Sequence, residues 1–455
     1  MKKRSIMALC CLAIMAPGLL WAQDEVQTLS LKECLEKALA NNQNIAISRY
    51  EEQIGDQQIR ETRARALPQV SGSANVTDNY KRNVLVLSAG TFPGVTTDQV
   101  LPVGNVYSTG LSADASQALF DASVFTAMKA AKAGKDYYKQ NTKQSEEDVI
   151  NQTAKVYYQI LASREQVKAQ DSNIAKLSKI VSATQGQYDN GLARKIDLDR
   201  IKVNLTNAQT ARMQQMNQIA IQTANLKVLI GLPFETQITP DDISLREIES
   251  AATTYIPAAD FNLANRTEIQ VLNAQIRLTD LQTKAIRAEN YPKLSAFFNY
   301  GYNGVTNTFR DYFKSGGSDI WYGIGSVGVR LNVPIFDGFA RQARTRKSAI
   351  QSLELQKQKE AVSLSLKAGY QSAKIQIANS INSIHAQKEN VELASNVYSS
   401  SQSNYNLGLA TLTDLLEAQT SFIQAQNSYT QALLDYKLAE LETIRSSGNL
   451  RSLLQ

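Results

Sequence analysis

Two turns carry the residues whose types and spacing could do chemistry. They are the stretches "YDNGLARKIDLDRIK", which begins at residue 188, and "YNLGLATLTDLLEAQ", which begins at residue 405. In each stretch a glycine should end one helix, and an aspartate lies in the first turn of the next. The equivalent residues are Tyr188 and Tyr405, Gly191 and Gly408, and Asp197 and Asp414. A carboxylate at this position can satisfy the free amides of a helix start.

Outside these turns, the sequence lacks the motifs of catalysis. It has no glycine-rich phosphate loop, no pair of histidine ligands and no Gly-x-Ser-x-Gly elbow. Its one histidine, His385, has no neighbours of ligand type. We therefore expect a protein that is not an enzyme and that uses no cofactor and no metal.

Residues 1–22 have the pattern of a secretory signal peptide, with a basic start, an apolar run and a small residue, Ala22, at the end. A lipoprotein would have a cysteine next, but the sequence has Gln23. Removing this segment removes three basic residues and no acid, so the net charge falls from +6 to +3 and gives no support to nucleic-acid binding. Cys34 is then the single cysteine, which excludes an intramolecular disulfide.

The chain contains one unit written twice. Shifting the sequence against itself by about 220 residues aligns a series of landmarks in one order. They are "ALANNQNI" with "NLANRTEI", "RARALPQVS" with "RAENYPKLS", "ALFD" with "PIFD", the two turns, and Gly231 with Gly448. We predict a first repeat at 23–230, a linker at 231–261, a second repeat at 262–447 and a tail at 448–455.

Most of each repeat should be helical. The predicted helices are 31–66, 122–188 and 195–230 in the first repeat, and 262–290, 338–405 and 411–446 in the second. Apolar residues alternate in steps of three and four, as in a coiled coil, most clearly from Leu415 to Ala439. A helix of roughly 65 residues is about 100 Å long. We therefore expect a cylinder of antiparallel coiled coils.

Four strands are predicted, near 68–78, 108–119, 292–303 and 322–335. Apolar and polar residues alternate along them, with Tyr300 and Trp321 near strand ends. This pattern fits strands that cross an outer membrane. A soluble sandwich shows the same alternation, but the signal peptide and the very long helices favour the membrane. Barrels in this setting begin at about eight strands, so the chain should form an oligomer of two or three copies.

This order of features resembles the TolC-like outer-membrane efflux proteins over essentially the whole mature chain. The resemblance rests on the signal peptide, the duplicated unit, the two Tyr-x-x-Gly-Leu-Ala turns and "DLLEAQTSFIQAQNSYTQALLDYKLAELET". It implies an α+β membrane protein of the cell outer membrane, a homotrimer with a twelve-stranded barrel in the lipid and a coiled-coil tunnel in the periplasm. It also implies two partners, a periplasmic adaptor and an inner-membrane pump or ABC transporter.

The resemblance also assigns roles to the turns, which would close the inner end of the tunnel. The gate residues would be Asp197, Tyr405, Asp414 and the constricting Glu417, and the adaptor-docking residues would be Gly191, Leu192, Gly408 and Leu409. The family's tip arginine is replaced by Ala410, with Ala193 as its counterpart. Candidate substitutes are Arg194, Lys195 and Arg200. On position alone, both aspartates could equally be helix caps.

Two other classes of protein share the long helices and glycine turns. A periplasmic coiled-coil adaptor or scaffold of a transport complex would be extractable without detergent. A coiled-coil filament protein would have no reason to carry alternating strands. The sequence does not identify an exported substrate, and the loops at 80–106 and 303–320 carry no pattern that predicts their structure.

Overall fold

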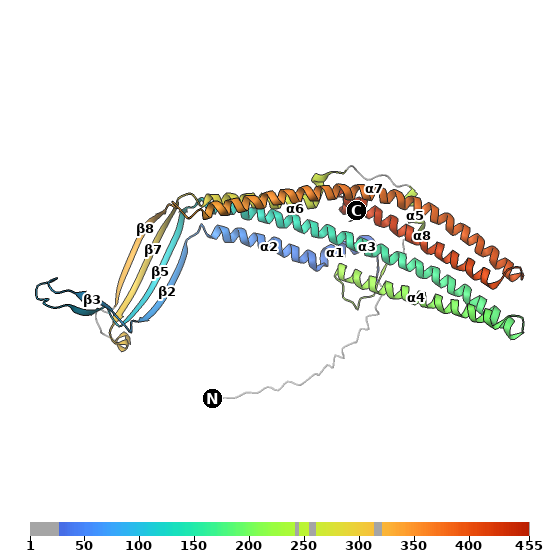
Figure 1. Cartoon of the computed structure of the whole chain (residues 1–455), viewed down its shortest axis with the longest axis horizontal. Coiled ribbons are helices and arrows are strands. Elements are labelled where there is room, and N and C mark those ends of the chain that lie inside the picture. The colour runs from blue at the N-terminus through green and yellow to red at the C-terminus, as the bar shows by residue number, and fades with distance from the viewer. Residues whose placement is uncertain (1–26, 242–244, 254–260, 314–320, 455) are drawn as a thin grey trace, which may run out of the picture.

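The computed structural model describes residues 27–241, 245–253, 261–313 and 321–454 of the 455-residue chain. The predicted signal peptide lies outside the described residues. The molecule is elongated, with a sheet at one end and a wall of long helices that continues it (Figure 1). The fold therefore separates into a β end and an α end, joined where the strands pass into the helices.

An antiparallel sheet forms the β end. Its strands, in spatial order, are β2 (Gln69–Asp78), β5 (Tyr107–Phe120), β7 (Lys293–Thr306) and β8 (Trp321–Asn332). The register aligns Val70, Ala115, Phe298 and Val327 in one row, and Ser71, Asp114, Asn299 and Ser326 in the next. Because successive residues point to opposite faces, one face is largely apolar and the other largely polar, as the alternation predicts.

Both faces of this sheet are open. No described element covers either one (Figure 1), and Val70 and Val327 on the apolar face are 76% and 80% exposed. On the polar face, the Ser73 and Ser112 hydroxyls are hydrogen-bonded at 2.8 Å. An apolar surface of this extent indicates contact with a membrane or with another protein.

The region at 80–106, for which the sequence predicted no structure, contains a hairpin. Its strands are β3 (Asn83–Leu87) and β4 (Gln99–Val103), and it projects beyond the sheet at the end away from the helices (Figure 1). The short 3₁₀ helix η2 (Phe309–Phe313) follows β7. The strands of this hairpin have near-continuous apolar runs instead of alternation, so periodicity gave no signal for them.

The α end is a wall of helices. They are α1 (Leu31–Asn41), α2 (Gln43–Ala64), α3 (Ala122–Asp189), α4 (Lys195–Ile230), α6 (Thr267–Ala288), α7 (Ala340–Asn406) and α8 (Leu412–Ser447). Helices α2 and α4 follow one another along α3, and α6 and α8 do the same between α3 and α7 (Figure 1). Tyr157 and Tyr436 are fully buried in these seams. Among the described residues, no helix has the combination of length and apolar character that a bilayer span requires.

Two predicted helix boundaries are wrong. The helix expected at 31–66 is divided at Asn42, whose backbone is extended (φ −63°, ψ 130°) and whose side chain accepts hydrogen bonds from the amides of Asn44 and Ile45. An asparagine that caps its own chain competes with helix continuation. The helix expected from residue 262 begins at Thr267, after the 3₁₀ turn η1 (Leu263–Asn265).

Short segments pack against the middle of the wall. Strand β1 (Gln27–Leu29) pairs in parallel with β6 (Ile238–Pro240) of the linker, and α5 (Leu245–Thr253) lies on α7 and α8. The tail helix η3 (Leu450–Leu454) contacts α1, α3 and α8. Glu249 of α5 accepts a hydrogen bond from the Tyr429 hydroxyl at 2.9 Å and pairs with Lys388. We call these segments the belt.

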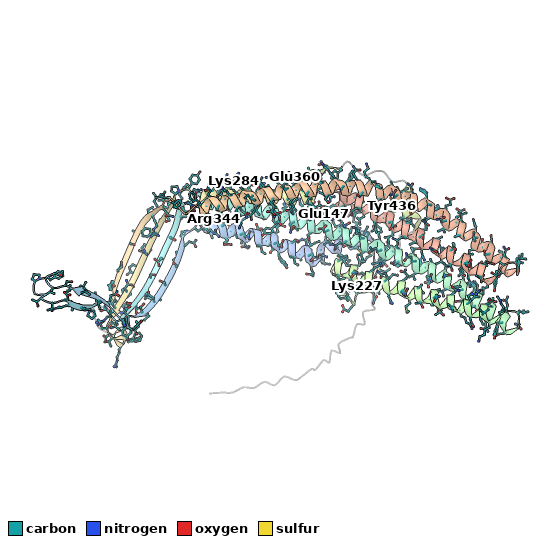
Figure 2. All side chains as sticks on the ribbon, viewed as in Figure 1. Glu147, Lys227, Lys284, Arg344, Glu360 and Tyr436 are labelled. Carbon is teal, nitrogen blue, oxygen red and sulfur yellow. The ribbon has the colours of Figure 1, made fainter. Side chains whose placement is uncertain are left out.

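A charged cluster on α3 ties the two repeats together beside the belt. Glu147, near the middle of the wall (Figure 2), accepts a hydrogen bond from the Thr267 hydroxyl of α6 at 2.6 Å. Asp148 pairs with Arg445 at the end of α8, at 3.2 Å. Burial raises the pKa of the Glu147 carboxyl above its usual value, and the nearby Glu268 acts in the same direction.

Glu147→Gln tests this cluster through pH. A raised folded-state pKa means that the folded protein binds this proton more tightly than the unfolded chain does. Its stabilising contribution is therefore complete below the ordinary value of 4.5 and is lost as pH rises through the raised pKa. The variant should raise the thermal unfolding midpoint near neutral pH and change it little below pH 4.5, as followed by circular dichroism. The exposed Glu389→Gln is the control, and equal shifts at both pH values would contradict the assignment.

Gly231→Ala tests the join between α4 and α1. Gly231 has a φ of 65°, and an added Cβ would lie 2.7 Å from the Asn41 backbone oxygen. The left-handed conformation alone costs about 1–2 kcal/mol for a residue with a side chain, so unfolding should occur at a clearly lower temperature. Gly369→Ala, in open space within α7, is the control and should be stabilising by about 1 kcal/mol. Equal unfolding temperatures for the two variants would contradict this account.

Candidate functional site

Both turns at the far end of the wall have the same backbone geometry. Gly191 and Gly408 have φ of 74° and 75°. In the first turn the Gly191 amide donates to the backbone carbonyl oxygen of Tyr188 at 2.9 Å, and the Leu192 amide donates to the backbone carbonyl oxygen of Gln187 at 2.7 Å. The second turn has the same two bonds at 3.0 and 2.8 Å. This pair is the Schellman motif, in which the left-handed position favours glycine.

A leucine follows each turn glycine and points into solvent. Leu192 is 81% exposed and Leu409 is 75% exposed. The residue at this place in a Schellman motif frequently packs back onto its own helix, but these two leucines do not. Each turn therefore presents an apolar side chain at the end of the molecule, where another protein can reach it.

The two turn aspartates have different partners. Asp414 forms a capping box with Thr411, whose hydroxyl donates to the carboxylate at 2.7 Å while the Asp414 amide donates to that hydroxyl at 3.2 Å. The hydrogen bonds from the Thr411 side chain and amide lower the pKa of the Asp414 carboxyl. Asp197 instead accepts two hydrogen bonds from the Arg194 guanidinium, at 2.8 and 3.2 Å. The helix-cap interpretation therefore describes Asp414.

Of the three candidate substitutes for the tip arginine, Arg200 reaches the other turn. Its guanidinium donates to the Thr413 hydroxyl at 2.8 Å, which links α4 to the first turn of α8. Arg194 stays within its own turn, and Lys195 has no ion pair among the described residues. The structure thus provides an arginine contact between the turns, from a position other than that of the family's tip arginine.

The remaining two gate candidates are near these contacts without joining them. Tyr405 packs against the apolar cluster at this end of the wall, and its hydroxyl makes no hydrogen bond to Asp197 within the described chain. Glu417 is exposed on α8 and forms no ion pair with the described residues. Their roles in a gate stay predictions, because both depend on neighbouring copies of the chain.

A buried amide pair connects α3 to α8 below the turns. The Gln419 side-chain amide donates to the Asn173 side-chain oxygen at 2.6 Å, and the two residues are 3% and 8% exposed. The side-chain oxygen of Gln419 is also buried, and it accepts no hydrogen bond from the described residues. Beside it lies a cavity of about 230 Å³, lined in part by Asn204 and Asn207. The site is polar and large enough to hold water.

An aromatic contact lies nearby. Tyr398 of α7 and Phe422 of α8 stack with ring centroids 5.8 Å apart, and the ammonium group of Lys176 on α3 lies 4.8 and 5.0 Å from the two centroids. Such cation–π contacts attract through the ring quadrupole. Phe422 lies in the apolar pattern from Leu415 to Ala439, but such a pattern does not reveal the partner helix, so this contact and the amide pair were not predicted.

We call these three contacts the hairpin junction: Arg200 with Thr413, Asn173 with Gln419, and Lys176 with the two rings. They join the hairpin of α3 and α4 to the hairpin of α7 and α8. Polar pairs in a helical seam fix register but stabilise less than apolar packing would. The junction therefore adds polar contacts, which fix the register, to a buried apolar cluster that spans both hairpins.

Gln419→Leu tests the amide pair. The single variant leaves the buried Asn173 amide without its partner, which should cost about 1–3 kcal/mol. Adding Asn173→Leu removes the unpaired group and should recover most of that loss. Thermal unfolding of both single variants and the double variant gives the coupling energy. Additive effects would show that the two side chains do not interact.

Two comparisons of sequence place the chain among known proteins. The profile of the outer membrane efflux protein family matches residues 34–232 and 260–449. The chain is 20% identical over 439 residues to the outer membrane efflux protein BepC of Brucella suis biovar 1 (strain 1330), covering 96% of this chain and 89% of BepC. It is 27% identical over 278 residues to the pyoverdine export outer membrane protein OpmQ of Pseudomonas aeruginosa, a match that covers 60% of this chain and only 55% of OpmQ.

Solved structures show the same fold. The outer membrane protein VceC of Vibrio cholerae superposes with a TM-score of 0.70 at 16% identity, covering 92% of this chain and 96% of that one. The outer-membrane channel OprN gives a TM-score of 0.71 at 16% identity, covering 92% and 90%. The family consists of channel proteins, which favours a channel over the periplasmic adaptor considered as an alternative. The chain belongs to the outer membrane efflux protein family, as an internally duplicated α+β channel protein of the outer membrane with the TolC-like fold.

Proposed function

We propose that three copies of this chain form a channel, with the sheets closing into one barrel and the helical walls into one tunnel. The observation that carries this proposal is the four-stranded sheet, whose two edges are unpaired and whose apolar face is uncovered among the described residues. Two copies would supply eight strands, and side chains fill the interior of a barrel of that size. Three copies supply twelve and leave a bore lined by the polar face.

Exposed apolar residues at both edges of the helical wall support this assembly. They are Ile350, Leu353, Leu364, Ile375, Leu393 and Val397 on α7, and Val203, Met213, Ile221 and Val228 on α4. Helix α7 lies at one edge of the wall, and α2 with α4 lies at the other. A head-to-tail contact between these edges closes into a ring when the rotation is right.

The inner end of this tunnel would be its gate. The two turns of each copy meet there, and Glu417 of three copies would form a ring that attracts cations. In our proposal the gate opens when the two hairpins of each copy separate at the hairpin junction. The polar contacts and the cavity beside Gln419 support this step, because they replace apolar packing in part of the seam between the hairpins.

The exposed turns support the partners that the family resemblance implies. Leu192 and Leu409, next to the left-handed glycines, would receive a periplasmic adaptor. An inner-membrane pump or ABC transporter would supply the energy and the cargo through that adaptor. OpmQ is named for pyoverdine export. The cargo of this channel would likewise be a solute that leaves the cell.

Arg200→Ala tests the gate in planar bilayers. Removing the contact with Thr413 should raise the open probability and the single-channel conductance, because the hairpins of a copy then separate more easily. Arg212→Ala is the matched control: Arg212 pairs with Asp171 on α3, inside the first hairpin, so its loss leaves the junction intact. Arg200→Ala channels that conduct like those of wild type and Arg212→Ala would rule out this contact as part of the gate.

A further inference from the structure

The two repeats keep an arginine at the same place, where a helix meets the sheet. Arg63 in "RARALPQVS" and Arg287 in "RAENYPKLS" both lie five residues before a proline. Each lies in the last turn of its helix, α2 or α6. Both side chains are exposed, and neither guanidinium has a hydrogen bond or an ion pair among the described residues. An arginine that both repeats keep without a partner in the described chain suggests a ligand from outside the chain.

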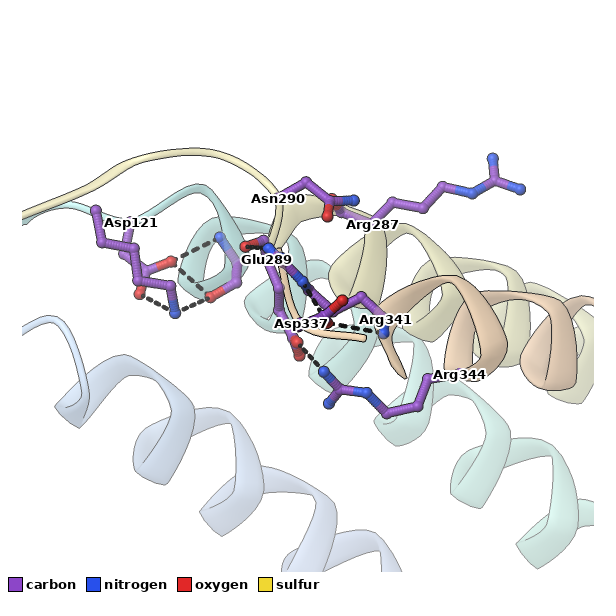
Figure 3. Close-up of polar contacts among 9 residues, drawn as sticks. Asp121, Arg287, Glu289, Asn290, Asp337, Arg341 and Arg344 are labelled. Atoms are coloured by element: carbon purple, nitrogen blue, oxygen red, sulfur yellow. Dashed lines mark hydrogen bonds and ion pairs between the residues drawn. The ribbon is translucent and has the colours of Figure 1, made fainter. Parts of the chain in front are cut away.

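Neighbouring charges at this level are already paired. The pairs are Lys293 with Asp121 at 3.1 Å, Arg341 with Asp337 at 2.7 Å, and Arg344 with Glu289 at 2.9 Å. Figure 3 shows these contacts, with Arg287 turned away from them. These acids at the junction of helices and sheet are thus paired with other bases, and Arg287 has no ion pair among the described residues.

Both arginines lie on one face of the helical wall. Glu61 and Arg65 of α2 line a cavity with α3. Arg63 is two residues from each, so it points to the other side of the helix. On α6, Arg287 follows Lys284 by one turn, and Lys284 lines the groove on the opposite face of the wall from that cavity. Figure 2 places Lys284 near the sheet end of the wall.

This face is the outside of the proposed tunnel. The groove of Lys284 and the next groove, between α6 and α7, share Ile276, and the second groove extends to Lys367. One turn further along α7, Tyr370 stacks on Phe261, which lies at the end of the linker, with centroids 4.9 Å apart. A linker inside the bore would obstruct it, so the face that carries the linker is the outer one.

Exposed apolar side chains occur in the segments that join the helices to the sheet. Leu67 is 55% exposed and Tyr291 is 60% exposed, and each follows its arginine by four residues. Phe336 and Phe339, between β8 and α7, are 73% and 67% exposed and pack edge to face at 5.3 Å. Aromatic residues next to cations are typical of the region where lipid head groups meet the hydrocarbon.

We propose that Arg63 and Arg287, with Lys284 beside the latter, bind the phosphate groups of phospholipids in the inner leaflet of the outer membrane. This inference rests on the proposed membrane position of the sheet. A guanidinium offers two parallel donors that match the oxygens of a phosphate. The duplication supplies two such sites per copy, which hold the base of the barrel at the level of the head groups.

The experiment compares Arg63→Gln/Arg287→Gln with Arg277→Gln/Lys367→Gln, which removes the same charge from the same face further from the sheet. Detergent-purified protein is incubated with phosphatidylglycerol, or with diacylglycerol of the same chains, and bound lipid is counted by native mass spectrometry. We expect wild type and the control variant to retain phosphatidylglycerol, and the Arg63/Arg287 variant to lose it at least about fivefold. Arg63→Lys/Arg287→Lys should retain an intermediate amount.

Several results would overturn the inference: equal retention by the Arg63/Arg287 variant and the control, equal binding of diacylglycerol, or displacement of the lipid by inorganic phosphate, which would indicate a free-phosphate site. A cation in the last turn also favours the helix dipole. If that were the whole role, the Arg63/Arg287 variant would unfold at a lower temperature with its lipid unchanged. Bilayer recordings of the wild type distinguish a failure of this inference from a failure of the proposed function. If the wild type conducts but the Arg63/Arg287 variant retains as much lipid as the control, only this inference fails. If the wild type never inserts, the proposed function fails.

Discussion

The rest of the molecule depends on how the unpaired edges of the four-stranded sheet are satisfied. Strands β2 and β8 each have one side that pairs with no other strand in the described part of the chain. In hydrocarbon each unpaired backbone group costs several kcal/mol, so only closed sheets span a bilayer. In our proposal the apolar face contacts lipid, and the strand edges can enter lipid only when they are paired. Closure with other copies is the arrangement that satisfies both conditions.

The strands determine where the two long helices begin, because each long helix follows a strand closely in the chain. Helix α3 begins at Ala122, immediately after β5, and its first turn is capped by Asp121. Helix α7 begins a few residues after β8, where Asp337 accepts a hydrogen bond from the Arg341 amide. The two aspartates are equivalent in the repeats, but the helix starts differ: Asp121 is the N-cap residue of α3, whereas Asp337 lies two residues before Phe339, the N-cap residue of α7. A closed sheet would thereby arrange the long helices around one axis.

Stability is distributed unevenly along the wall. Near the middle, the belt and the charged cluster on α3 add contacts to seams that bury Tyr157 and Tyr436 completely. Toward the turns, polar pairs and a cavity interrupt the apolar contacts between the hairpins, and the buried side-chain oxygen of Gln419 has no hydrogen-bond partner among the described residues. Regions with weak contacts open first. Movement at the inner end, with the middle held fixed, is what a gate at that end requires.

Periodic features were predictable from the sequence. The repeats, the long helices, the alternating strands and the two glycine turns all leave a regular pattern, and the family match confirms the fold class. Features that depend on one side chain were not predictable. Asn42 interrupts a helix whose apolar period continues through it, and the partner of Gln419 lies 246 residues away. Arg200 was one of three candidates because spacing does not show which side chain crosses between hairpins.

The number of chains in the native particle tests the central claim most directly. Native mass spectrometry of the protein extracted from membranes in detergent measures it without any substitution. Our account predicts one dominant species of three chains, because twelve strands pair every edge and leave an open bore. A particle of one or two chains that is stable in detergent would contradict it.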